Sequence, residues 1–87
     1  MPAKPSAAKR ARQAIKRRAR NRAYKSALHT SVKRVEIALA AGDKEAARSA
    51  LVGACVRLDK MAGKGVIHRN AAARRKSRLS RRVDAMA

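Results

Sequence analysis

The residues with the clearest chemistry in this sequence are the lysines and arginines at its two ends. Residues 1–25 contain ten Lys or Arg and no acid, and residues 64–87 contain eight against the single acid Asp84. Arg binds phosphate with two parallel hydrogen bonds, and Lys binds it as a point charge. Within a helix, bases four residues apart, such as Lys16 and Arg20, would repel each other. The pattern therefore predicts an anionic partner, and nucleic-acid phosphates are the commonest one.

Both basic ends supply candidate phosphate-binding residues. In all, 24 Lys or Arg residues face 5 acidic ones, a net charge of +19 on 87 residues. A fold that brings the two ends together would build one strongly positive face. The candidates are Lys9, Arg10, Arg12, Lys16, Arg17, Arg18, Arg20, Arg22, Lys25, Lys64, Arg69, Arg74, Arg75, Lys76 and Arg78.

Other side-chain chemistry has little support in the sequence. The five acidic residues are scattered, and His29 and His68 have no nucleophile or carboxylate at catalytic spacing. Cys55 is the only cysteine, so it forms no disulfide within the chain, and we interpret it as a small buried residue. Gly63-x-Gly65 is too short for a nucleotide-binding loop and is interpreted as a helix terminator. We predict no enzyme activity, no metal ion, no cofactor and no small-molecule substrate.

One long helix is predicted to carry the N-terminal bases. Residues 7–41 contain no Gly or Pro and follow a flexible tail of residues 1–6, with Ser6 as the predicted N-cap. The second half of this helix has one apolar stripe, formed by Tyr24, Leu28, Val32, Val35 and Leu39. The first half offers only Ile15 and alanines, so we expect it to project from the rest of the molecule.

Two shorter helices are predicted to complete the fold. Gly42 can end the first helix in the left-handed conformation, and Asp43 is a good N-cap for a second helix over residues 44–62. A third helix is predicted from His68 or Asn70 to Ala85. The second helix is expected to bury Ala47, Leu51, Ala54, Leu58 and Met61, with Val52, Cys55 and Val56 widening the stripe toward two neighbours. The third is expected to bury Ala72, Leu79, Val83 and Met86.

The predicted fold class is therefore all-α, an antiparallel three-helix bundle with an extended basic N-terminal helix, forming one domain over residues 7–87. No stretch alternates with the period of a strand. Leu, Ile and Val number only 14 beside 21 Ala, so we expect a small Ala-rich core whose stability the partner completes.

Composition leaves several partners and destinations open. No apolar run approaches the roughly 20 residues of a membrane span. An acid-free, Arg-rich N-terminus is also typical of a mitochondrial presequence, but bases occupy nearly every helical face here, which disfavours that interpretation. Tyr24 is the only aromatic residue, so stacking of bases on aromatic platforms is excluded as the main binding mode. Readout of backbone and shape fits a folded RNA, and histone-like DNA compaction fits the same composition.

A C-terminal motif narrows the choice. Residues 64–79 read Lys-Gly-Val-Ile-His-Arg-Asn-Ala-Ala-Ala-Arg-Arg-Lys-Ser-Arg-Leu. This stretch resembles the bacterial small-subunit ribosomal protein S-twenty family, whose recurrent stretch is Lys-Gly-x-Ile-His-x-Asn-x-Ala-Ala-Arg-x-Lys-Ser-x-Leu. The N-terminal part is similar in register, at Ser6, Lys9, Arg10, Arg17, Arg18, Arg20, Asn21, Lys25 and Ser26.

The resemblance implies a three-helix bundle that binds 16S ribosomal RNA directly and early in assembly of the small subunit, in the cytoplasm and bound to the ribosome. It adds further RNA-binding candidates, namely Asn21, Ser26, Gly65, His68 and Asn70. His68 and Asn70 could equally be caps of the third helix. The opening Met1-Pro2-Ala3-Lys4-Pro5 departs from the family pattern, as do Ile15 and His29. We expect no homo-oligomer and no membrane partner, and a nucleoid-type DNA-binding protein remains the competing hypothesis.

Overall fold

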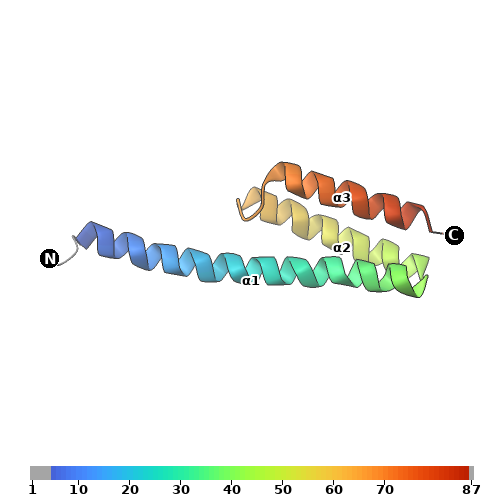
Figure 1. Cartoon of the computed structure of the whole chain (residues 1–87), viewed down its shortest axis with the longest axis horizontal. Coiled ribbons are helices and arrows are strands. Elements are labelled where there is room, and N and C mark those ends of the chain that lie inside the picture. Colours follow the sequence, from blue (N-terminus) through green and yellow to red (C-terminus); the bar gives the residue numbers. More distant parts are fainter. Residues whose placement is uncertain (1–4, 87) are drawn as a thin grey trace.

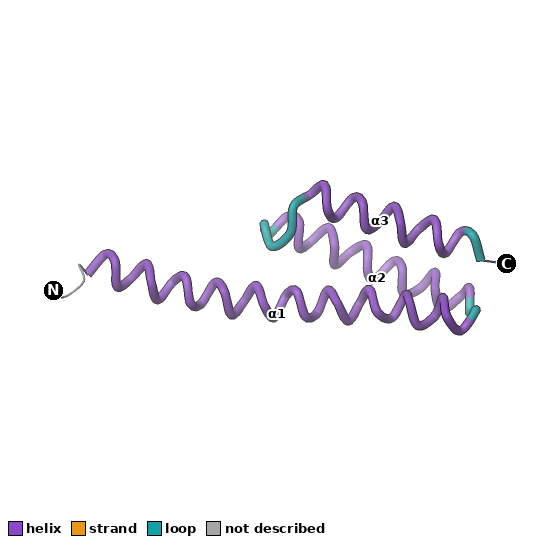
Figure 2. The backbone as a smooth tube through the Cα atoms, viewed as in Figure 1, coloured by secondary structure: helices purple, strands orange, loops and turns teal. Residues whose placement is uncertain are grey.

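Three helices account for nearly all of the structure, a computed structural model that describes residues 5–86. They are α1 (Pro5–Ala41), α2 (Lys44–Gly63) and α3 (Arg69–Asp84), and the described residues form no strand. The chain runs up α1, back along α2 and up again along α3, so neighbouring helices are antiparallel (Figure 1). Only two short loops connect them (Figure 2). The predicted all-α, antiparallel three-helix bundle is confirmed.

The two connections use the same backbone device. After α1, Gly42 takes a φ of 73°, its N–H donates to the carbonyl of Leu39, and the N–H of Asp43 donates to the carbonyl of Ala38. After α2, Gly65 takes a φ of 74°, and the equivalent bonds join it to Ala62 and join Val66 to Met61. This Schellman pattern satisfies the last carbonyls of each helix and needs a residue that tolerates positive φ.

Each of the two later helices begins at a side-chain cap. The Asp43 carboxylate accepts a hydrogen bond from the N–H of Ala46 at 3.1 Å, as the sequence predicted for an N-cap. At α3 the cap is His68, whose Nδ1 accepts from the N–H of Asn70 at 3.1 Å. Of the two predicted candidates, His68 is therefore the cap. Asn70 lies inside the helix.

Two predictions about helix ends were wrong. The first helix already includes Pro5 and Ser6, so Ser6 is a helical residue and not the N-cap. Proline is well suited to a first turn because its fixed φ is helical and its missing N–H is not needed there. Gly63 remains in α2 as its last residue, so Gly65 alone supplies the left-handed turn. The predicted tail otherwise falls on residues 1–4, outside the described residues.

The core is small and consists of two neighbouring clusters of buried residues. One cluster lies toward the turn after α1 and contains Val35, Ala38, Ala47, Ala54, Leu79 and Val83. The other lies toward the turn before α3 and contains Leu28, Leu58, Met61 and Ala72, with Tyr24, Val66 and Ile67 packed against it. Nearly every predicted stripe residue belongs to a cluster or packs against one. The largest fully buried side chains are Leu58, Val35 and Val83.

The widened apolar stripe predicted on α2 is not buried. Val52 is 66% exposed and Val56 is 48% exposed, and only Cys55 is half-buried. At 3.6 residues per turn, Val56 points about 160° away from Leu58. Both neighbours therefore pack against one side of α2, where Ala47 and Ala54 allow close approach.

The first half of α1 projects beyond the other two helices, as predicted (Figure 1). The molecule measures 66 × 21 × 16 Å, and no residue before Leu28 is buried among those described. We call residues 5–23 the arm and residues 24–86 the bundle. The helix passes from arm to bundle without a break, so the change at Tyr24 is one of surroundings and not of backbone conformation.

Candidate nucleic-acid interface

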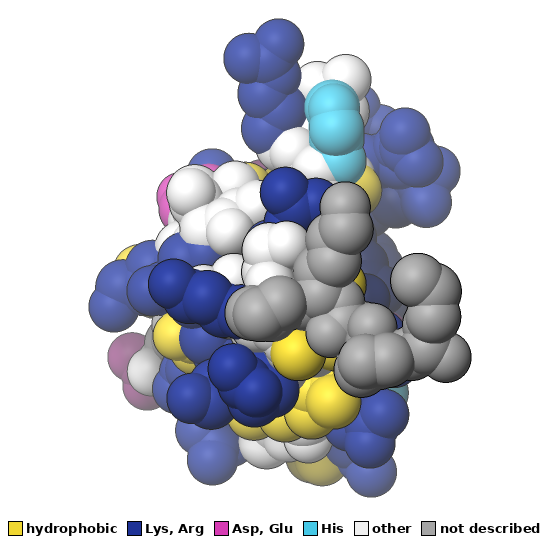
Figure 3. All heavy atoms as spheres, turned by 90° about the vertical axis from the view of Figure 1, so that its left-hand side faces the viewer, with side chains coloured by type: hydrophobic (Ala, Val, Ile, Leu, Met, Phe, Trp, Pro, Cys, Tyr) yellow, Lys and Arg dark blue, Asp and Glu magenta, His cyan; other side chains and the backbone are white. Residues whose placement is uncertain are grey.

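The arm presents its bases to solvent over its whole described length. It carries eight Lys or Arg and no acid, and every one of these bases is exposed. They are Lys9, Arg10, Arg12, Lys16, Arg17, Arg18, Arg20 and Arg22. Viewed from the arm end, Lys and Arg side chains gather around the molecule on several sides (Figure 3). The arm therefore offers a charged rod, suited to a polyanion that contacts it from more than one direction.

The two basic ends of the chain meet where the arm joins the bundle. Arg20 lies 6.0 Å from the centroid of the Tyr24 ring, and the Nζ of Lys64, in the loop before α3, lies 5.2 Å from the same centroid. Both distances are within range of cation–π attraction. The aromatic ring thus lies close to one basic side chain from each end of the sequence. Because the arm then projects away from α3, the two ends do not form the single continuous face that the charge pattern suggested (Figure 1).

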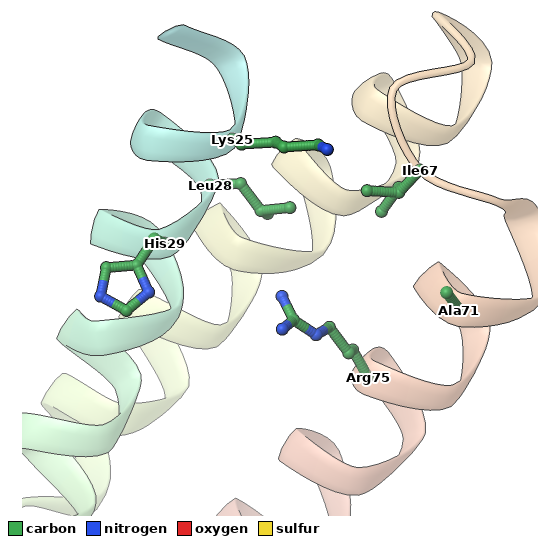
Figure 4. Close-up of a pocket in the computed structure, with 6 residues that line it drawn as sticks. All are labelled: Lys25, Leu28, His29, Ile67, Ala71 and Arg75. Atoms are coloured by element: carbon green, nitrogen blue, oxygen red, sulfur yellow. The ribbon is translucent and has the colours of Figure 1, made fainter. Parts of the chain in front are cut away.

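A hollow of about 410 Å³ opens beside this junction. Lys25 and Leu28 reach into it from α1, and Arg75 reaches in from α3 (Figure 4). Ile67 of the loop and Ala71 of α3 complete the apolar lining, and His29 lies at the outer edge on α1 with its ring turned away from Arg75. The hollow therefore combines one cation from each basic end of the sequence with the apolar side chains of Leu28, Ile67 and Ala71.

Beyond the junction, α3 continues the basic surface. Because His68 accepts a hydrogen bond at Nδ1, its ring hydrogen is on Nε2, and the exposed side chain can still donate outward. Arg69, Asn70, Arg74, Arg75 and Arg78 follow it, and all are exposed. The cap role and a contact with phosphate are therefore compatible for His68.

Lys76 differs from its neighbours because it is already paired. Its Nζ donates to the Asp59 carboxylate of α2 at 3.0 Å. The hydrogen bond and the charge of Asp59 raise the pKa of Lys76 above its usual value of 10.5. A second ion pair joins Arg82 of α3 to Glu36 of α1 at 3.6 Å. These pairs tie α3 to α2 and to α1, and the first of them leaves Lys76 less free for phosphate than the other candidates.

Asn21 is the other candidate with a distinct environment. It is half-buried at the base of the arm, in a shallow hollow shared with Arg18, Arg22 and Lys25. Among the residues that the structure describes, nothing donates a hydrogen bond to its buried Oδ1.

No helix of residues 5–86 is long and apolar enough to cross a membrane, and these residues hold no cluster of metal-binding side chains.

Comparison with known proteins places this chain in a family. The profile of the family described as "Ribosomal protein S20" matches residues 2–84. The chain belongs to the ribosomal protein S20 family. A relative from Shouchella clausii, named "Small ribosomal subunit protein bS20", is 52% identical over 86 residues, which cover 99% of this chain and 98% of the relative. One of the same name from Thioalkalivibrio sulfidiphilus is 57% identical over 81 residues, covering 93% and 94%.

Family membership confirms the resemblance seen in residues 64–79. Ribosomal proteins are structural components, so the prediction that the chain is not an enzyme is also confirmed. Of the RNA-binding candidates that the sequence suggested, the structure places all but two on the exposed surface, the exceptions being the half-buried Asn21 and Lys76. Gly65 and Ser26 are exposed as well, and Ser26 accepts a hydrogen bond from Thr30 at its carbonyl.

Sequence analysis did not single out the apolar part of the hollow. Leu28 was assigned to the core stripe, Ile67 was seen only as a family-motif residue, and Ala71 was not singled out. His29, for which the sequence offered no catalytic partner, is exposed. The available signal was that Leu28 and Ile67 each neighbour a basic segment, but the distance between them depends on how α3 packs back on α2.

Proposed function

We propose that this chain is a structural protein of the small ribosomal subunit that binds 16S ribosomal RNA directly and supports its early folding and assembly. Its relatives are named as small-subunit proteins, and the ribosomal RNA of such a particle is a large polyanion. The proposal places the protein in the cytoplasm, bound to the ribosome, as a single copy without a membrane or small-molecule partner.

The observation that carries the proposal is the exposed, acid-free arm joined to a second basic surface on α3. Eight cations along one helix repel each other in the free protein, and RNA phosphates relieve that repulsion with release of counterions. Because the arm contains no aromatic residue, its contacts are with backbone phosphate and sugar. The arm and α3 can then hold two segments of RNA on one protein.

Early action in folding follows from the same arrangement. A small protein whose two basic surfaces bind neighbouring RNA segments lowers the repulsion between those segments before larger contacts form. The exposed basic residues of α2, namely Arg48, Arg57 and Lys60, lie outside this proposed surface. They provide a matched control because they are exposed and carry the same charge.

Filter binding tests the proposal with two triple variants. Replacing Lys16, Arg17 and Arg18 with Ala should weaken binding to a 16S rRNA transcript far more than replacing Arg48, Arg57 and Lys60 with Ala, although both remove three charges. The wild-type protein should also prefer the transcript to duplex DNA of equal length, and should sediment with the small subunit through a high-salt wash. Equal preference for duplex DNA would favour the nucleoid-protein hypothesis instead.

A further inference from the structure

The hollow between α1 and α3 combines an apolar surface with a cationic one. Its floor is formed by Leu28, Ile67 and Ala71, and its rim carries Lys25 and Arg75. Its volume of about 410 Å³ falls within the range of roughly 300–1,000 Å³ that is typical of sites for small organic ligands. The Arg75 side chain extends from α3 toward Leu28, and the Lys25 side chain extends from α1 toward Ile67 (Figure 4).

These features are complementary to one nucleotide more than to a phosphate alone. An unstacked nucleobase has flat apolar faces, which suit the aliphatic floor, and it stacks on the plane of a guanidinium. The phosphates on either side of it are anions, which suit an ammonium at the rim. A phosphate by itself would gain nothing from Leu28 or Ile67.

A second hollow on the opposite side of α1 and α2 shows the contrast. It is lined by small residues and a single base, Arg34, with Ser31, Ala46, Ser49, Ala50, Gly53 and Ala54. Among these lining residues no second cation faces Arg34, and no large aliphatic side chain forms a floor. The hollow beside the junction therefore offers both cations and large aliphatic side chains to a nucleotide, and the second hollow does not.

We propose that the hollow beside the junction receives a single unstacked nucleobase of the bound RNA, with the Arg75 guanidinium against its face and Lys25 on an adjacent phosphate. The inference rests on the proposed function, because the occupant belongs to the RNA that the arm and α3 bind. It adds a contact that depends on one unpaired nucleotide to an interface that otherwise reads only backbone and shape.

Filling the hollow tests the proposal without changing charge. Ala71→Leu adds a side chain inside the hollow, whereas the matched Ala73→Leu adds the same side chain on an exposed face of α3, about 200° around the helix. Ala71→Leu should lower affinity for a 16S rRNA transcript about tenfold or more, the effect of losing one stacked base. Its salt dependence should stay as in the wild type, and Ala73→Leu should bind as the wild type does.

Chemical probing of the RNA bases identifies the occupant. One unpaired base should be protected by the wild type and by Ala73→Leu, and should become reactive with Ala71→Leu. Equal losses of affinity in the two variants, or an unchanged protection pattern with Ala71→Leu, would overturn the proposal. Circular dichroism and the thermal midpoint establish that both variants are folded.

A second pair of variants decides the case if Ala71→Leu does not fold. Arg75→Lys keeps the charge but removes the planar guanidinium, and Arg57→Lys makes the same change at an exposed site on α2, outside the hollow and outside the proposed RNA-binding surface. The base should lose protection only with Arg75→Lys. If Arg75→Lys protects the base as well as the wild type, the contact is with phosphate alone and the proposal is wrong. If the wild type does not bind the transcript at all, the proposed function and this inference fail together.

Discussion

The arm and the bundle share the continuous helix α1, yet different interactions stabilise the two regions. In the bundle, ten buried apolar residues from all three helices form the core. The arm has none of them, and its helix depends on the high helix propensity of Ala and Arg. Helices without tertiary packing are marginal in water. The arm is therefore specialised for binding, and the bundle positions it, so changes in the two regions should affect different measurements.

The largest effect should come from removing the arm. A variant without residues 2–22 has none of the eight arm bases but keeps every core residue, so its affinity for a 16S rRNA transcript should fall on the order of 100-fold or more at physiological salt. Filter binding over a range of salt should show a slope lower by about 0.9 for each phosphate that the arm no longer neutralises. The thermal midpoint of the bundle should hardly change. A bundle that unfolds without the arm would contradict the division between the two regions.

A core substitution should have the opposite signature. Leu58 is completely buried, so Leu58→Ala should lower the free energy of unfolding by about 2–5 kcal/mol. The matched change Ile15→Ala removes a similar side chain that is 63% exposed on the arm, and it should leave the stability of the bundle unaltered. Urea denaturation followed by circular dichroism measures both. Similar losses in the two variants would mean that the arm contributes to the core.

Charge reversal should separate the arm from α3. Arg74→Glu should cost more binding than Arg12→Glu, because α3 is fixed by packing and ion pairs while the arm is held only by its own helix. Losing a geometrically fixed, bidentate contact costs about 1–3 kcal/mol, whereas losing one general phosphate contact mainly lowers the salt slope by about 1. Filter binding on cognate and random RNA should show reduced discrimination for Arg74→Glu alone. Equal losses on both RNAs for both variants would place no specificity in α3.

The smallest effect should come from the exposed ion pair between Lys76 and Asp59. The raised pKa of Lys76 means that this contribution to stability is fully present below about pH 10.5, and is lost as pH rises through the raised pKa. Asp59→Asn should therefore lower the thermal midpoint slightly at neutral pH, and the two proteins should converge at strongly alkaline pH. Because Lys76 is then free, RNA affinity should rise slightly. A large drop in stability would show that this pair holds α3 in place.

Much of this architecture was predictable from the sequence because the signals were local. Gly42 and Asp43 are residues preferred at a helix end and a helix start, and the spacing of Leu28, Val35 and Leu39 predicts a buried face. The errors arose where a choice depended on neighbours. Val52 and Val56 are apolar, but they are exposed because both partner helices pack on the other side of α2.

The candidate site divides in the same way. Exposure of the arm bases followed from charge and from the missing apolar stripe, so those residues were named from composition. The hollow was not predicted because it forms only when the loop at Ile67 brings α3 back beside α1. Leu28 and Ile67, which both line the hollow, are 39 positions apart in the sequence. Loop geometry of this kind depends on the positive φ of Gly65 and the cap at His68, and neither determines an interhelical distance by itself.

The unbroken course of α1 from Pro5 to Ala41 fixes the angular phase of the arm relative to the hollow. Each helical residue advances about 1.5 Å and turns about 100°, so one residue inserted at the junction would rotate every arm base by about 100° relative to Arg75. Seven inserted residues would nearly restore the direction but displace the arm by about 10 Å. The continuous helix thus fixes both the distance and the direction between the arm and the hollow. An RNA that contacts the arm and the bundle together must present its phosphates with matching separation and orientation.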